Sequence, residues 1–335
     1  MKTRSKTLNV VSSGVVCPGG ATVESLEQPW TKTNIQNASG TRFFTASPSD
    51  PAGDELQKWL GKPRLRRAST LSLMLIEAVH QALRDQPVEI LEHTGVVACF
   101  FLGCLNYPIR FYREITTDGR RFASPVLFPE TVFNSPISHV VSTLGIGGPV
   151  YSQIGDKSAW ASALQTAECW LRNGSAKKVV VVGAEEFDPH ALDAFRAAGW
   201  MRSKDFHPGS GAGALLVDLA DESKTAITRI SQGHSFFHKK EVSQKAREGL
   251  ETLDRGCPVL QTATAWTTRI ESEVLAHREL VPNPNRGVEC FSASTAWDTI
   301  RAVNLLKRGG GAGNLVVPIW GLTSEFAALQ LSSVS

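Results

Sequence analysis

The chain has 335 residues, of which 42% are hydrophobic and 20% charged, and its net charge at pH 7 is +3. This balance excludes a disordered chain, and the interspersed charges do not favour a nucleic-acid-binding protein. The basic cluster KPRLRR at 62–67 is typical of a solvated helix start, although a modest basic patch also suits an acidic protein partner. The length fits one large domain or two of average size.

The cysteine pattern indicates a reducing compartment. None of the six cysteines forms a CxxC pair, and none has zinc-like spacing to a histidine. Several lie in apolar runs, where a free thiol packs as a small hydrophobe. The N-terminal apolar stretch is interrupted at 12–14, so we expect a first strand rather than a signal peptide, and no run reaches the length of a membrane span. We therefore expect a cytoplasmic protein without a metal or other cofactor.

Strands and helices alternate through the first part of the chain. A first strand ends at the Pro-Gly turn of LNVVSSGVVCPGG, and apolar positions at three- and four-residue steps predict a helix over 69–84. The apolar run at 94–103 predicts a fully buried strand, because its residues do not alternate with polar ones. The aromatic-rich residues 104–131 are expected to be irregular, and 130–145 is expected to be a short helix with an early proline.

The segment 147–186 reads as strand, tight turn, helix, turn and buried strand. Its first turn holds Asp156, Lys157 and Ser158, and many enzymes place a nucleophile at such a strand-to-helix turn. A buried lysine can act as nucleophile or base, whereas the ordinary alternative is an ion-paired or surface lysine with Asp156 beside it.

The last third repeats the alternation, which places the chain in the α/β class. The predicted strands lie in ITRISQGHSFF, CPVLQTAT, NLVVPIWG and EFAALQLSS, and the predicted helices lie at 239–254, in ESEVLAH and in ASTAWDTIRAVNLLKRGG. The glycines at 209, 211 and 213 precede a strand (211–220) rather than a helix, so we expect close backbone packing there and no phosphate loop.

Two further features are candidates for chemistry. Glu185 and Glu186 end the valine-rich strand, where sites form in α/β folds, but neighbouring residues on a strand point to opposite sides. At most one of them therefore faces a pocket. His207 lies in a loop beside glycines and is a pocket candidate, with a structural role as the ordinary reading.

These segments resemble the thiolase-fold β-ketoacyl synthase family. The similarity is carried by LNVVSSGVVCPGG, RRASTLSLMLIEAVHQAL, SPVLFPETVFNSPISHVVSTLGIGGP, GSGAGALLVDL and IWGLTSEFAALQL, and it runs along most of the chain. The resemblance implies two similar βαβαβ halves in a layered α-β-α-β-α core. We expect the N-terminal half at 1–220 and a shortened C-terminal half at 221–335.

The resemblance also implies that the family's catalytic residues have been replaced. The family's catalytic cysteine stands nine residues after the glycine of its Gly-Pro strand start and 17 before the glycine that closes the next helix. Counted from Gly148 and from Gly174, both spacings give Lys157. The two family histidines correspond roughly to Thr264 and Glu289.

A thioester-forming thiolate is needed for condensation, and a lysine would form a stable amide instead. The chain therefore resembles the non-condensing chain-length factors of type II polyketide and polyene systems, which pair with an active ketosynthase and shape its acyl-chain tunnel. We expect an acyl carrier protein as a further partner. The pocket and tunnel candidates are Phe133, Ser158, Trp160, Trp200, His207 and Leu322.

Two alternatives stay open from the sequence. One is an acyltransferase-like enzyme with altered chemistry, in which Lys157 acts with Ser158, Glu289 or His207. The other is a homodimeric scaffold that binds a carrier protein without a synthase partner.

Overall fold

The computed structural model describes residues 7–30, 33–36, 42–45, 53–66, 68–187, 189–200, 206–220, 224–309 and 313–333. Arg67, the last residue of the basic cluster, lies outside these ranges. None of the helices in the described ranges has the length and apolar character of a membrane span.

Residues 1–220 contribute five described strands to the main sheet, in the order β1-β8-β6-β4-β5, with β5 at the sheet edge. β4 runs parallel to β5 and β6, whereas β8 is antiparallel to β1 and β6. These strands are β1 (Thr7–Val16), β4 (Thr94–Phe100), β5 (Val150–Ile154), β6 (Lys178–Glu185) and β8 (Gly211–Ala220).

The C-terminal half continues the sheet in the order β12-β11-β14-β15-β9, and β9 pairs with the start of β1. These strands are β9 (Thr225–Ile230), β11 (Val259–Leu260), β12 (Leu280–Val281), β14 (Gly313–Trp320) and β15 (Glu325–Ser333). Three pairings involve short strands. β2 (Thr33–Gln36) pairs with β3 (Arg42–Thr45), and β7 (His207–Pro208) pairs with β13 (Val288–Glu289). β10 (His234–Ser235) pairs with β15.

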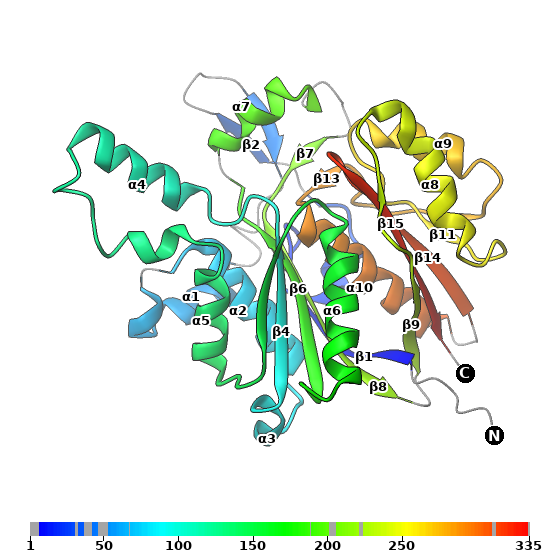
Figure 1. Cartoon of the computed structure of the whole chain (residues 1–335), viewed down its shortest axis with the longest axis horizontal. Coiled ribbons are helices and arrows are strands. Elements are labelled where there is room, and N and C mark those ends of the chain that lie inside the picture. Colours follow the sequence, from blue (N-terminus) through cyan, green and yellow to red (C-terminus); the bar gives the residue numbers. More distant parts are fainter. Residues whose placement is uncertain are drawn as a thin grey trace.

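Helices cover both faces of each half (Figure 1). The inner layer consists of α6 (Ala159–Arg172) and α10 (Ser292–Arg308). One outer layer consists of α2 (Thr70–Leu83) and α5 (Ser135–Leu144). The other consists of α8 (Val242–Glu251) and α9 (Thr267–Val274). The remaining helices are α1 (Gly53–Leu60), α3 (Val88–Leu91), α4 (Asn106–Thr117) and α7 (Pro189–Ala197), with 3-10 turns η1 (Val23–Leu26), η2 (Pro63–Leu65), η3 (Phe128–Thr131) and η5 (Lys239–Glu241).

The apolar strand β6 shows why the layers form. Val179 and Val181 face the core around α6 and α10, and Val180 and Val182 face the core around α2. Successive side chains of a strand point to opposite faces, so a strand covered on both sides is apolar throughout. The inner core also takes residues from β14 and β15, which makes α6 and α10 the layer shared by the two halves. This arrangement is the predicted layered α/β fold.

Close packing explains the glycines of β8 and of its neighbour β6. A Cβ at Gly213 would lie 2.8 Å from the Cβ of Ala296 on α10, and one at Gly183 on β6 would lie 2.2 Å from the carbonyl oxygen of Ser292. Both distances are too short for real contacts, so α10 can approach the sheet only over glycine. The packing role predicted for this glycine segment is confirmed.

Several element predictions were wrong in detail. Residues 104–131 are not wholly irregular, because they contain α4, whose Pro108 lies in the first turn, where proline is tolerated. None of its side chains is fully buried, although Tyr107 packs against the core around α2 and the Phe111 ring lies 5.6 Å from the Phe128 ring. ITRISQGHSFF forms two strands, CPVLQTAT forms the two-residue β11, and α9 starts and ends earlier than the predicted helix.

Candidate functional site

The turn after β5 is fastened to the loop before β15. The Asp156 carboxylate accepts hydrogen bonds from the Thr323 backbone N–H at 2.7 Å and from the Thr323 hydroxyl at 2.9 Å. Its other oxygen accepts from the Lys157 backbone N–H at 2.8 Å. A Cβ at Gly321 would lie 2.8 Å from Asp156 Oδ2, so the close approach of this loop requires glycine there.

Lys157 lies at the start of α6 and is 1% exposed. Its Nζ is 3.3 Å from Glu289 Oε2, and the Thr264 hydroxyl donates a hydrogen bond to the same oxygen. The other Glu289 oxygen accepts from the Phe291 backbone N–H at 2.7 Å, just before the N-terminus of α10. The three positions that the sequence placed at the family's catalytic residues therefore form one buried cluster.

The charges in this cluster are unevenly balanced. Burial opposes the charged form of Lys157, but the carboxylates of Glu289, Asp298 and Asp156 outweigh it and raise the pKa of Lys157. The amine is therefore a protonated ammonium at neutral pH. Burial raises the pKa of Asp298 to about 7, although the Lys157 charge acts in the opposite direction. One lysine thus lies beside more carboxyl groups than it can neutralise.

A second buried carboxylate shapes the segment that carries Thr264. Glu271 on α9 accepts the backbone N–H groups of Thr262 and Ala263, each at 3.0 Å, and pairs with Arg286 at 2.7 Å. A carboxylate with two backbone donors and a guanidinium is well satisfied inside a protein. Glu271 therefore positions the loop that brings Thr264 to Glu289.

Glu185 ends β6 inside the protein. Its carboxylate accepts the backbone N–H groups of Phe101, Leu102 and Gly103, the last two at 3.0 and 3.1 Å. Burial raises the pKa of Glu185 to about 8, and these three hydrogen bonds lower it in part. Glu186 instead accepts the Leu71 backbone N–H. Of the two glutamates, Glu185 is the one that faces the interior near the cluster.

Two residues with strained backbones flank the cluster. Ala265 has φ 50° and Phe291 has φ 44°, values that L-residues other than glycine rarely adopt. Such strain persists only where the surrounding contacts hold it, and it gathers at functional sites. Ala265 directly follows Thr264 and Phe291 comes two residues after Glu289, so the strained backbone lies beside both cluster residues.

Aromatic rings fill the space beside the strained residues. Phe291 stacks on Phe101 with ring centroids 4.3 Å apart, and Phe195 stacks on Trp200 at 5.3 Å. We call this packed group the aromatic cluster. Its buried members are Ala191, Leu192, Phe195, Trp200, Phe206, Ala265, Phe291 and Leu322.

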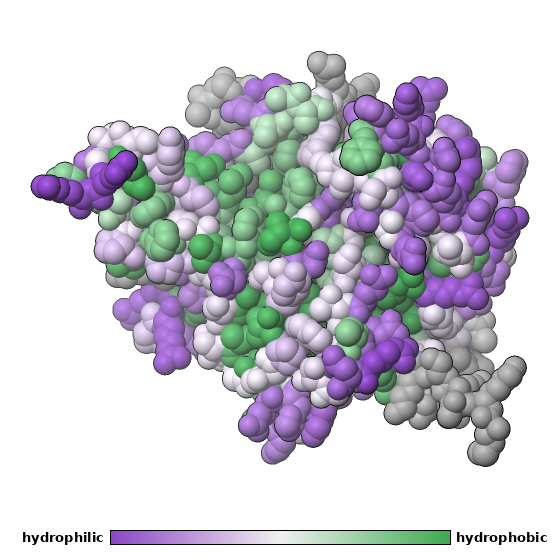
Figure 2. Space-filling view, in the orientation of Figure 1, coloured by the Kyte–Doolittle hydropathy of each residue, from purple (hydrophilic) through white to green (hydrophobic). Residues whose placement is uncertain are grey.

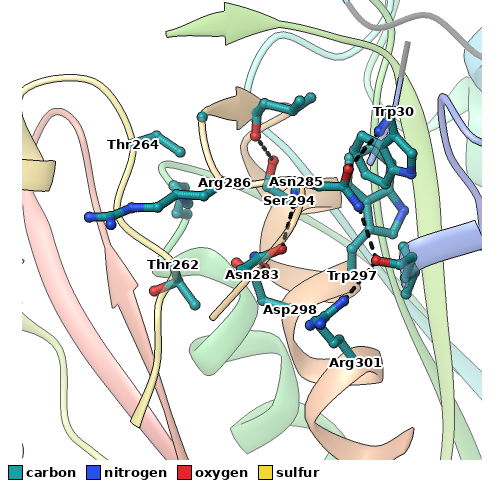
Figure 3. A pocket seen from close by; sticks show the side chains of 14 residues that line it. Trp30, Thr262, Thr264, Asn283, Asn285, Arg286, Ser294, Trp297, Asp298 and Arg301 are labelled. Carbon is teal, nitrogen blue, oxygen red and sulfur yellow. Dashed lines mark hydrogen bonds between the residues drawn. The ribbon is translucent and has the colours of Figure 1, made fainter. Parts of the chain in front are cut away.

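A small cavity adjoins Lys157 on the side of α10 (Figure 3). Its volume of about 20 Å³ gives room for a single water molecule. Thr262, Thr264 and Arg286 line one side, and Trp297 and Arg301 line the other (Figure 3). An acyl chain does not fit this space as it stands.

The segment 26–30 lies beside that cavity, and its residues Leu26 and Trp30 help to line it. The Asn285 side chain donates to the Leu26 carbonyl and accepts from the Trp30 backbone N–H, each at 3.0 Å. Arg301 donates to the same carbonyl at 2.8 Å and pairs with Glu27 at 3.3 Å. Segments from the two ends of the chain thus meet over the site.

The tunnel candidates lie in different surroundings. Trp200 and Leu322 belong to the aromatic cluster, and His207 on β7 lies opposite Val288, beside the Glu289 strand. Phe133 is 39% exposed, and its ring packs against Gly103. The other two candidates, Ser158 and Trp160, are buried. Ser158 lies at the N-terminus of α6, and Trp160 packs in the inner core and donates its indole N–H to the Thr299 hydroxyl at 3.0 Å.

The sequence did not reveal Asp298, Glu271, Arg286 or Phe291 as site residues. Asp298 lies in the helix that the sequence predicts at ASTAWDTIRAVNLLKRGG. The only sign of its role is that it is a polar residue on the buried face of that helix. The others become visible only once distant segments meet. In the described ranges no group of three or more His, Cys, Asp or Glu side chains could hold a metal ion.

The chain is similar in sequence to known β-ketoacyl synthases. Residues 52–218 match the family model of the "Beta-ketoacyl synthase, N-terminal domain". A curated relative, "Beta-ketoacyl-[acyl-carrier-protein] synthase III" of Thiobacillus denitrificans, is 34% identical over 105 residues. That match covers 30% of this chain and 31% of the relative, so it spans about a third of each protein.

Solved structures match the whole fold. "The ishigamide ketosynthase/chain length factor" has a TM-score of 0.80 at 20% identity, covering 98% of this chain and 100% of that chain. A type II polyketide synthase acyl-carrier protein in complex with its ketosynthase and a β-ketoacyl synthase from Burkholderia phymatum both have TM-scores of 0.77 at 14% identity, with the same coverage. At these identities the likeness shows a common fold.

Proposed function

We propose that this chain is a non-condensing ketosynthase-like subunit, because residues 52–218 match the β-ketoacyl synthase N-terminal domain and the fold resembles solved ketosynthases. It pairs with an active β-ketoacyl synthase and bounds the space into which the partner's acyl chain grows, in fatty acid, polyketide or polyene biosynthesis. Two structural relatives support this proposal, one a ketosynthase/chain length factor and the other a ketosynthase in complex with an acyl-carrier protein.

The observation that carries the proposal is the pairing of Lys157 with Glu289 and Thr264. Condensation in this family needs a thiolate that holds the acyl group as a thioester, because a thioester can be passed on and an amide cannot. Lys157 is buried, protonated and paired with Glu289, so its amine has no free lone pair. The cluster stabilises the turn without offering a nucleophile.

A separate feature supports pairing with another subunit. Apart from Val88 and Phe237, every exposed large hydrophobic side chain in the described ranges lies in 112–133 or in β5. We call these two segments the pairing face. Its exposed apolar residues are Tyr112, Phe122, Val126, Phe128, Val132, Phe133, Val150, Tyr151 and Ile154.

The pairing face has the properties of a protein interface. Among the described strands β5 pairs only with β4, so its outer edge can pair with another strand. α4 projects from the body of the molecule (Figure 1), and an apolar area extends over the face between α4 and β4 (Figure 2). A contiguous apolar surface around an open sheet edge marks a subunit contact.

The alternative in which Lys157 is a nucleophile has less support. It needs a neutral amine, and the carboxylates around Lys157 favour the charged form. The amine is also bound to the Glu289 carboxylate, which holds it in a charged pair. The homodimer alternative differs from the proposal only in the partner, and the experiment below separates the two.

The test is to express the chain together with a neighbouring ketosynthase that retains its cysteine and both histidines. We expect a stable complex on size-exclusion chromatography, and a product whose chain length changes when Phe133 at the pairing face is replaced by alanine. The chain alone should give no condensation product. A stable homodimer that ignores every neighbouring synthase would contradict the proposal and favour the scaffold alternative.

A further inference from the structure

A pocket in the C-terminal half lies outside the site described so far. It has a volume of about 330 Å³ and is bounded by the end of α8, the end of α9 and the turns that follow these two helices. The turn after α9 leads into β12, which lies at the opposite end of the sheet order from β5. A contact through the pairing face therefore does not cover this pocket. We call it the arginine pocket.

The floor of the arginine pocket is apolar. Leu250 and Leu275 are 7% and 1% exposed, and Val274 is partly buried. All three pack in the core beneath α8 and α9. These side chains offer no hydrogen bonds, so they favour the apolar part of a ligand. Each methylene group that leaves water for such a surface strengthens binding by about 4-fold.

Three arginines form the rim of the pocket. Arg247 and Arg255 are exposed, and Arg278 is partly buried. Arg247 pairs with Glu273 at 2.9 Å, but their side chains are 52% and 59% exposed, and such a surface pair is weak enough to exchange for a ligand. Within the described ranges Arg255 has no ion pair. The rim is therefore positively charged, with Glu251 as the acidic residue among those that line it.

Arg278 is fixed in place and retains unused donors. One of its terminal nitrogens donates to the Asp254 carbonyl at 2.9 Å and to the Cys257 carbonyl at 3.0 Å, which ties it to the turn that carries Arg255. Its Nε is buried and has no hydrogen-bond partner in the described part of the chain. The Asp254 carboxylate accepts the Gly256 backbone N–H at 2.9 Å and does not line the pocket. A guanidinium held in this way suits a carboxylate or phosphate, which matches its planar set of donors.

We propose that the arginine pocket binds a small organic anion, a carboxylate or phosphate joined to a short alkyl or similarly apolar group. The head group pairs with the rim arginines, and the apolar group lies on the floor. The volume suits such a molecule, because ligand pockets begin at about 300 Å³ and combine an apolar lining with a few polar groups. The proposal does not rest on the proposed function, since the pocket shares no lining residue with the pairing face or with the Lys157 cluster.

The test measures binding of octyl phosphate to the full chain by isothermal titration calorimetry, at concentrations below those at which it forms micelles. Butyl phosphate should bind at least about 10-fold more weakly, because four methylene groups no longer lie on the floor. Inorganic phosphate should bind more weakly still. Titration with octanoate shows which head group the rim prefers, and binding of either octyl compound supports the proposal.

Variants locate the binding at the rim. Arg247→Gln with Arg255→Gln should weaken binding of octyl phosphate by about 10-fold or more, because charge-assisted hydrogen bonds to the head group are lost. Glu251→Gln should tighten binding by about 2- to 5-fold, because it removes a negative charge from the rim. A gain in affinity does not result from misfolding. Arg64→Gln with Arg66→Gln, at two exposed arginines of the N-terminal half, is the matched control and should bind as the wild type does.

Three results overturn the proposal. The first is that the wild-type chain binds neither octyl phosphate nor octanoate, or binds them only where they form micelles. The second is equal affinity for octyl phosphate and inorganic phosphate, which would leave the apolar floor without a role. The third is unchanged affinity in the rim double variant, or an equal loss in the control double variant, because the anion would then bind elsewhere.

Discussion

Lys157 and Glu289 form a buried charge pair whose two members depend on each other. Each would be very costly to bury alone, and each is brought inside by a different segment of the chain. Thr264 and the Phe291 backbone complete the hydrogen bonds of Glu289. The pair therefore acts as a specific link between the start of α6 and the start of α10.

Replacing Lys157 with methionine should lower the free energy of unfolding by about 3–5 kcal/mol, because Glu289 would be left buried without its cation. Adding Glu289→Gln should recover most of that loss, because the amide needs no counter-charge. Urea unfolding of the wild type, both single variants and the double variant measures the coupling directly. Equal losses in the single Lys157 variant and the double variant would contradict this account.

The buried acid groups predict a stability that falls as pH rises. Glu185 has a pKa of about 8 in the folded chain against 4.5 in its ordinary state, so the folded chain holds an extra proton between these values. This proton stabilises the folded chain fully below the ordinary pKa of 4.5. The stabilisation is lost as pH rises toward the folded-state pKa of about 8, by up to about 1.4 kcal/mol per pH unit. Asp298 acts in the same direction up to about pH 7.

Glu185→Gln should remove one of these contributions and flatten the decline in stability between pH 5 and pH 8, a window set by the two pKa values of Glu185. Urea unfolding at several pH values measures the slope. Glu89→Gln, a change at an exposed position on α3, is the control and should keep the wild-type slope. An unchanged slope in Glu185→Gln would show that this carboxyl does not hold the proton.

The spacing of motifs in the sequence predicted the cluster residues but not the contacts that they make. Lys157, Thr264 and Glu289 came from the spacing of glycines and helices in a resembling family, and the structure brings all three together. Asp298 and Glu271 gave no such signal, because a buried carboxylate is recognisable only when its donors are known. Those donors lie on other segments, and sequence periodicity cannot pair them.

Among the elements, the central helices and strands that bury an apolar face were predicted, whereas α4 and α7 were missed. The helices α2, α6 and α10 and the strands β4, β6 and β8 have the apolar pattern that a covered face requires, and all were predicted. None of the α4 side chains is fully buried, whereas α7 was missed although it buries Ala191, Leu192 and Phe195. In α4, Tyr107 packs on the core, but Tyr112 is 68% exposed and is available to another surface.

The edge strand β5 gives the prediction at this scale. Tyr151→Lys with Ile154→Lys places two charges on the pairing face, at positions 49% and 44% exposed. We expect the pair with the synthase to dissociate while circular dichroism and the unfolding midpoint of the isolated chain stay close to wild type. Val88→Lys, also at an exposed apolar position, should leave the pair intact. Retention of the complex by the β5 variant would place the interface elsewhere.

For the whole molecule, the replacement of the nucleophile is only one of two reasons why the proposed subunit would not catalyse condensation. The cavity at Lys157 holds about one water molecule, and the aromatic cluster fills the adjacent space. Restoring the family's reactive residues would therefore not restore the room that a substrate needs. Catalysis depends on the shape of the site as well as on its residues.

Lys157→Cys, combined with Thr264→His and Glu289→His, should consequently remain inactive in condensation. Incubation with an acyl thioester and mass spectrometry of the intact chain should show no acyl adduct above the level of the wild type. Malonyl decarboxylation should likewise stay at background. Acylation of the introduced thiol in a folded triple variant would show that the side chains alone separate this chain from an active synthase.

The position of β1 in the sheet has a consequence for synthesis in the cell. β1 is the first strand described, yet its main partner β8 begins at Gly211, and β9 beside it is completed by β15 near residue 333. At ordinary translation rates the ribosome needs on the order of tens of seconds to reach β8. During that interval both edges of β1 lack their partner strands, and they are covered only after β8 and β9 have been synthesised.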